Sequence, residues 1–135
     1  MERLFTLIVI NCALRNGDAH LKNFGIVYDD VQGEARLAPV YDLVTTSVYL
    51  PKDSLALTLN GTTRWPSTKE LQRMGETRMS GSPARVKGIL ERVADAMATT
   101  STSLRTYIDD HQEFEEIGKR MLQQWEQGIA ISLNQ

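Results

Sequence analysis

The sequence is poor in cysteine and lacks any apolar run long enough to span a bilayer. Its single cysteine, Cys12, cannot form an internal disulfide, and nothing in the sequence indicates an oxidising compartment. Cys12 lies within the apolar run 4–14, which predicts a buried and unreactive thiol. The run is shorter than a membrane span and is not followed by a clear signal cleavage site. We therefore expect a buried helix in a cytoplasmic protein without a membrane segment.

The sequence also lacks a large excess of charge of either sign. Its net charge of −2 gives the whole chain no electrostatic attraction to nucleic acid. Apolar residues make up 41% and charged residues 24%, a balance that excludes a disordered polar chain. With 135 residues, the chain is predicted to form a single domain over 1–135.

Hydrophobic spacing predicts a helix followed by a small β-hairpin in the first half. Apolar residues recur at helical spacing over 3–15, and Asn16 and Gly17 are a suitable stop because both tolerate positive φ. Short strands are predicted at 24–28 and 35–40, on either side of a polar turn. A loop over 43–54 and a further strand or extended segment over 55–59 complete this half.

The second half, 67–135, has helical patterns throughout. A helix is predicted after Ser67, another with Pro83 in its first turn and a last one over 112–128, with a polar break or a frayed helix end at 99–103. The apolar stripes of these predicted helices indicate core packing. Trp65, in the loop before them, fits either the core or a surface that contacts a partner protein. The expected fold is mostly α-helical with a small β-hairpin.

The residues whose side chains suit metal binding or proton transfer lie on either side of the predicted hairpin. Asn23 comes just before its first strand and Asp42 just after its second, so the open end of the hairpin brings them together. Their amide and carboxylate oxygens suit a hard cation such as Mg²⁺. Asp18 lies five positions before Asn23 and could accept a proton from an attacking hydroxyl. This order of Asp, Asn, hairpin and Asp is typical of protein kinases.

Two further polar residues lie in the same loop. Lys22 could neutralise charge on a transferred phosphoryl group or on the phosphates of a nucleotide. His20 takes the position, two residues after the Asp, where typical eukaryotic kinases have their loop lysine. It could orient Asp18 or pack beneath the loop.

The sequence Asn-Gly-Asp-Ala-His-Leu-Lys-Asn-Phe-Gly at 16–25, followed by Pro-Val-Tyr-Asp-Leu-Val at 39–44, resembles the C-terminal part of HipA-family serine/threonine kinases. These kinases are the toxins of bacterial toxin–antitoxin pairs. The resemblance implies a kinase-like C-terminal lobe of α+β type, with Asp18 as catalytic base and Asn23 and Asp42 as magnesium ligands. It also implies that His20 and Lys22 support catalysis and that Lys22, Asn23 and Asp42 bind the Mg²⁺–ATP cofactor.

The segment 1–47 would then carry the catalytic and metal-binding residues, and 67–135 the helical part. The resemblance covers the catalytic loop through to the end of the chain, more loosely from 67 onward. No glycine-rich phosphate loop and no strand with an ATP-binding lysine occur in the sequence. We therefore expect an incomplete kinase that lacks its N-terminal lobe and is inactive by itself.

The expected partners are a protein substrate and either a DNA-binding antitoxin or the missing N-terminal lobe. Two other functions fit the sequence. One is a non-catalytic binding module or split-kinase subunit that binds an antitoxin or another protein. The other is a metal-dependent hydrolase that uses Asp18, His20 and Asp42.

Overall fold

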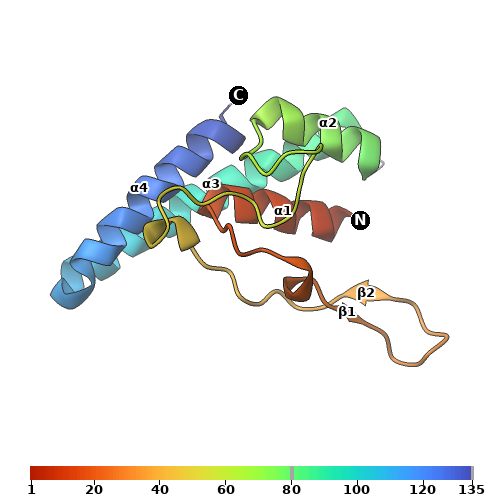
Figure 1. Cartoon of the computed structure of the whole chain (residues 1–135), viewed down its shortest axis with the longest axis horizontal. Coiled ribbons are helices and arrows are strands. Elements are labelled where there is room, and N and C mark those ends of the chain that lie inside the picture. Colours follow the sequence, from red (N-terminus) through yellow and green to blue (C-terminus); the bar gives the residue numbers. More distant parts are fainter. Residues whose placement is uncertain (80, 135) are drawn as a thin grey trace.

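The computed structural model describes residues 1–79 and 81–134 and is mostly helical with a small antiparallel hairpin (Figure 1). This confirms the fold class expected from the sequence. The elements are α1 (Glu2–Leu14), β1 (Ile26–Val27), β2 (Arg36–Leu37), α2 (Thr68–Arg78), α3 (Pro83–Asp110) and α4 (Glu115–Ser132). Short 3₁₀ turns occur at η1 (Leu21–Asn23), η2 (Thr46–Val48) and η3 (Gln112–Phe114).

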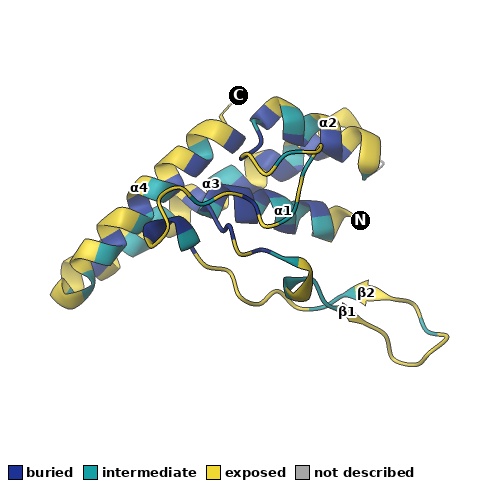
Figure 2. Ribbon diagram, viewed as in Figure 1, coloured by how far each residue is buried: buried dark blue, intermediate teal, exposed yellow. Residues whose placement is uncertain are grey.

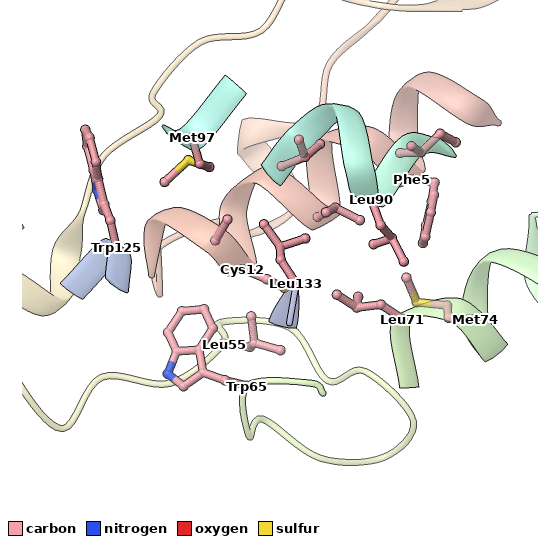
Figure 3. Packing of buried hydrophobic residues seen from close by; sticks show 14 of the residues in the cluster. Phe5, Cys12, Leu55, Trp65, Leu71, Met74, Leu90, Met97, Trp125 and Leu133 are labelled. Carbon is pink, nitrogen blue, oxygen red and sulfur yellow. The ribbon is translucent and has the colours of Figure 1, made fainter. Parts of the chain in front are cut away.

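The core forms where the four helices meet. Helix α1 packs against α3 and α4, and α2 packs against α3. Aromatic, aliphatic and sulfur-containing side chains from these helices fill the space between them (Figure 3). The innermost residues include Phe5, Val9, Cys12, Leu71 and Leu90. Burying side chains of this size stabilises the fold by roughly 1.5–3 kcal/mol each, so the helical part carries most of the stability.

Trp65 belongs to this core. Of the two roles that fit the sequence, core packing and contact with a partner protein, the structure therefore supports core packing. Only 7% of its surface is exposed, and its indole N–H donates to the backbone carbonyl of Asp53 at 3.1 Å. Cys12 is also buried, as predicted, and burial raises the pKa of its thiol to about 12. The thiol is therefore protonated at neutral pH and has little nucleophilic character.

The hairpin projects from the helices and is exposed over most of its surface (Figure 2). Ile26 lies opposite Leu37 and Val27 opposite Arg36. The strands have two residues each, much shorter than the predicted 24–28 and 35–40. The reason is that the hairpin lacks a second layer to cover it: Ile26, for example, is 65% exposed. The stretch 55–59 contributes a single bridge, between Leu59 and Thr62.

The predicted polar break at 99–103 is wrong, because α3 continues through it to Asp110. The hydroxyl groups of this stretch donate to the carbonyl oxygen four residues earlier in the helix. Thr99 donates to Asp95 at 3.0 Å and Thr100 to Ala96 at 2.8 Å. The polar side chains are thus hydrogen-bonded without breaking the helix. Helix α4 likewise extends past the predicted end at 128, to Ser132.

The end of α1 also differs from the prediction by one residue. The left-handed backbone is adopted by Arg15, with φ 59° and ψ 44°, rather than by Asn16 or Gly17. The amide of Arg15 donates to the Cys12 carbonyl at 3.2 Å, and that of Asn16 donates to the Asn11 carbonyl at 2.9 Å. These bonds satisfy carbonyl groups at the helix end.

Within residues 1–79 and 81–134, every helix is too short or too polar to cross a membrane.

Helices α1 and α4 approach closely where Gly128 faces the end of α1. A Cβ atom at this position would collide with the backbone carbonyl oxygen of Ala13, which cannot move without shifting α1. We predict that Gly128→Ala lowers the free energy of unfolding by roughly 1–3 kcal/mol. The measurement is urea unfolding followed by circular dichroism.

Gly88→Ala in α3 is the matched control. The nearest atom to a Cβ at Gly88 is the end of the Arg92 side chain, 3.7 Å away. Alanine is a better helix former than glycine, so this variant should be more stable by about 0.5–1 kcal/mol. Equal effects of the two substitutions would contradict the close α1–α4 contact.

Candidate functional site

The base of the hairpin brings Asn23 and Asp42 into direct contact. The Asn23 side-chain amide donates to Asp42 Oδ2 at 2.6 Å, although the residues are 19 positions apart. The other end of the Asn23 amide, Oδ1, accepts the backbone N–H of His20 at 3.2 Å. Asn23 closes the η1 turn, so its side chain is oriented from both sides. An amide and a carboxylate therefore lie together next to the loop that carries Asp18.

Asp42 has an unusual backbone conformation, with a positive φ of 57°. Non-glycine residues rarely adopt this conformation, and those that do are held there by their surroundings. The buried Asn16 side chain donates to the Asp42 carbonyl oxygen at 3.3 Å. The neighbouring Tyr41 hydroxyl donates to the backbone carbonyl of Lys22. Both contacts tie the Asp42 segment to the loop that precedes the hairpin.

Asp18 projects from this loop toward solvent. Its backbone N–H donates to Asn16 Oδ1 at 3.2 Å, and its side chain is 64% exposed. His20 Nε2 lies 3.9 Å from Asp18 Oδ1, close enough for an ion pair when the imidazole is protonated. The structure thus places His20 beside Asp18. The Lys22 side chain is exposed on the same loop.

A buried pair of asparagines, Asn11 and Asn16, supports the loop, and neither is among the site residues expected from the sequence. Asn16 is 1% exposed, and its Nδ2 donates to Asn11 Oδ1 at 2.7 Å. Asn11 in turn donates to the Leu7 carbonyl at 2.9 Å. The sequence signal was present: Asn11 interrupts an otherwise apolar helix, and a buried amide needs hydrogen-bond partners. Its partner could not be identified before the chain was folded.

Arg15, which caps α1, is the second buried polar residue beside the site. It is 8% exposed, and its guanidinium carbon lies 4.7 Å from the centre of the Trp65 ring. Burial lowers the pKa of the Arg15 guanidinium below its ordinary value, and the negative charge of Asp53 opposes this shift. The aromatic face and the nearby carboxylate both favour the cation. Nothing in the sequence indicated that these three residues would meet.

The side chains at the site suit a hard cation better than zinc. Across 1–79 and 81–134, no three His, Cys, Asp or Glu side chains gather in a way that could hold a metal ion. The hydrolase alternative, which required Asp18, His20 and Asp42 as a ligand set, is therefore not supported. Asn23 and Asp42 would provide one amide oxygen and one carboxylate once the Asn23 amide turns its oxygen from the His20 N–H toward Asp42. Such a small set of oxygen ligands fits Mg²⁺, which usually keeps several waters and binds substrate phosphates.

Comparison with known proteins gives a family match over most of the chain. The family model described as HipA-like C-terminal domain matches residues 1–101. The match therefore begins with α1, ahead of the loop that carries Asp18, and ends within α3. The match thus differs from the resemblance seen in the sequence, which starts at this loop and runs, more loosely, to the end of the chain.

Two curated proteins of Sinorhizobium fredii (strain NBRC 101917 / NGR234) match shorter segments. The protein named "Putative kinase Y4mE" is 47% identical over 47 residues, which are 35% of this chain and 11% of that protein. The protein named "Putative kinase Y4dM" is 39% identical over 56 residues, or 41% of this chain and 13% of that protein. The matched segments thus span only about an eighth of these relatives.

The Asn16 side chain is expected to stabilise both the fold and the loop. Replacing Asn16 by alanine leaves Asn11 Oδ1 and the Asp18 amide without their partner. We predict a loss of roughly 1–3 kcal/mol in the free energy of unfolding. The measurement is chemical unfolding, with the exposed Asn134→Ala as control. Equal stabilities of the two variants would show that the buried network contributes nothing.

Proposed function

Because this chain belongs to the HipA-like C-terminal domain family, we propose that it is the catalytic lobe of a serine/threonine kinase. The reaction proposed is transfer of the γ-phosphate of ATP to a protein hydroxyl. The observation that carries the proposal is the contact between Asn23 and Asp42 across the hairpin, with Asp18 on the preceding loop. Phosphoryl transfer depends mainly on position and charge, and this arrangement supplies both.

Asp18 is proposed as the catalytic base. Its carboxylate is exposed, so a hydroxyl of a protein substrate can reach it, while its backbone is held by Asn16. The carboxylate would accept the hydroxyl proton as the oxygen attacks phosphorus. His20 lies beside it and would limit the orientations of the carboxylate. Lys22 would place a positive charge near the phosphates.

Asn23 and Asp42 are proposed to hold Mg²⁺ and, through it, ATP. When bound, the ion would neutralise charge on the phosphate oxygens. The two residues contribute one oxygen ligand each. Their contact supports this role because it brings the two side chains within 2.6 Å of each other. The contact is made by Asn23 Nδ2, and Asn23 Oδ1 accepts the His20 N–H, so metal binding would require the amide to turn its oxygen toward Asp42.

The exposed apolar surface around the hairpin favours contact with a further protein surface. Large apolar side chains are unusually exposed here, and side chains of this kind mark protein interaction sites when they gather on one surface. They are Ile26, Tyr28, Val31, Val40 and Tyr41. A groove of about 760 Å³ lies between α1 and the hairpin.

We propose that this surface packs against the part of a kinase that covers ATP, or against an antitoxin or other protein partner. On this view, the chain is one catalytic lobe that needs another lobe for activity. The same surface fits the second function left open by the sequence, a non-catalytic binding module or split-kinase subunit. The kinase variants below distinguish the two, because only an enzyme depends on Asp18.

Asp18→Asn and Asp42→Ala are predicted to lower the rate of phosphoryl transfer by at least about 100-fold. The first removes the proton acceptor and the second a metal ligand. The measurement is transfer of radioactive phosphate from ATP to protein by the full gene product that carries this sequence. Asp109→Asn, at the distant end of α3, is the matched control and should retain full activity. Full activity of either site variant would reject the assignment.

Metal binding can be measured separately with Mn²⁺ as a paramagnetic probe. Mn²⁺ should broaden the NMR signals of residues next to Asn23 and Asp42, because it accepts the same oxygen ligands as Mg²⁺. In Asp42→Asn, we expect the apparent Kd for Mn²⁺ to rise roughly tenfold. Asp109→Asn should bind as the unmodified protein does. Broadening that persists unchanged in Asp42→Asn would place the metal elsewhere.

A further inference from the structure

Thr46 occupies a junction between the catalytic loop and the Asp42 segment. It begins η2, four positions after Asp42. Its hydroxyl oxygen accepts the backbone N–H of Gly17, the residue directly before Asp18, at 2.7 Å. The same hydroxyl donates to the Asp53 carboxylate. One side chain thus connects the loop that carries Asp18 to the segment that carries Asp42.

The direction of these bonds follows from the chemistry of the groups. A hydroxyl has one proton, and an ionised carboxylate can only accept. With its proton directed to Asp53, the Thr46 oxygen presents a lone pair to the Gly17 N–H. The Arg15 carbonyl, 3.3 Å from the same hydroxyl, is the more distant of the two acceptors. Asp53 therefore orients Thr46, and Thr46 orients Gly17.

Asp53 is itself held in place. Its Oδ1 accepts the Ser54 N–H at 2.9 Å, and its backbone carbonyl accepts the Trp65 indole N–H at 3.1 Å. Gly17 lies so close to Asp53 that a Cβ atom at this position would overlap the carboxylate. A side chain at position 17 would therefore displace the Asp53 carboxylate from Thr46.

Two more hydrogen bonds join the same two segments. The Ser47 hydroxyl donates to the Arg15 carbonyl at 3.2 Å, and the Asn16 side chain donates to the Asp42 carbonyl at 3.3 Å. Asn16 also bonds the Asp18 N–H, whereas Thr46 bonds Gly17, the residue next to Asp18. The link through Thr46 differs from the others because it depends on a charged side chain, that of Asp53.

We infer that Thr46 and Asp53 are positioning residues that hold Asp18 in place relative to Asn23 and Asp42. This inference rests on the kinase function proposed above. Neither residue is expected to touch the substrate. Their loss would displace the base and the metal ligands relative to each other, which should lower kcat while leaving ATP binding nearly unchanged.

The hydrogen bond can be tested in the chain itself by exchange of the Gly17 amide proton, measured by NMR. Thr46→Val removes the acceptor at nearly constant volume, so Gly17 exchange should become roughly tenfold faster. Thr46→Ser retains the hydroxyl and should stay within about twofold of the unmodified chain. Thr106→Val, on the exposed side of α3, is the control for the substitution. Unchanged Gly17 exchange in Thr46→Val would overturn the inference.

The positioning role is tested by kinase kinetics in the full gene product. Thr46→Val should lower kcat about tenfold with the KM for ATP within about twofold, and Thr46→Ser should restore kcat. Asp53→Asn keeps the volume of the side chain but is a weaker acceptor. It should lower kcat about fivefold, and it carries the test if Thr46→Val does not fold.

The outcomes separate this inference from the proposed function. An active protein that requires Asp18 but is unaffected by Thr46→Val and Asp53→Asn overturns the positioning role alone. So does a kcat that Thr46→Ser fails to restore, because the hydroxyl would then not be the cause. A protein that is fully active with Asp18→Asn, or inactive without any substitution, overturns the proposed function and the positioning role together.

Discussion

The arrangement of the site depends on how α1 ends inside the helical core. Asn16 is buried there and binds Asn11, the Asp18 amide and the Asp42 carbonyl. A buried amide is costly without partners, so these bonds restrict where the loop and the Asp42 segment can lie. Arg15, packed on Trp65, anchors the same turn. The buried residues Asn16 and Arg15 therefore help to fix the positions of the exposed polar residues of the site.

The hairpin acts mainly as a connector. Two residues in each strand suffice to bring its open end together, and Asn23 meets Asp42 there. Hydrogen bonds at the base of the hairpin compensate for its small apolar burial. A site built this way has exposed polar groups and a firmly held backbone, which suits the proposed phosphoryl transfer because position and charge carry most of that reaction.

The last helix contributes to the site segment although it lies beyond the family match. The Trp125 indole N–H of α4 donates to Thr45 Oγ1 at 2.7 Å, in the buried layer behind Asp42. Gly128 lets the same helix approach α1 closely. Helix α4 thus supports both the helix that precedes the loop and the segment that follows the hairpin, so the family match over 1–101 understates the part of the chain on which the site depends.

The sequence by itself determined the helices, the hairpin and the meeting of Asn23 with Asp42, because periodicity and turn residues act over short distances. The break predicted at 99–103 is wrong because the hydroxyl groups there form hydrogen bonds within the helix. The predicted strands are too long because no second layer covers the hairpin. Only the tertiary structure decided that Thr46 would meet Gly17 and Asp53, and that Arg15 would pack on Trp65. These contacts join the end of α1 and the loop after it to residues 29 or more positions further along the chain, and no local pattern encodes such contacts.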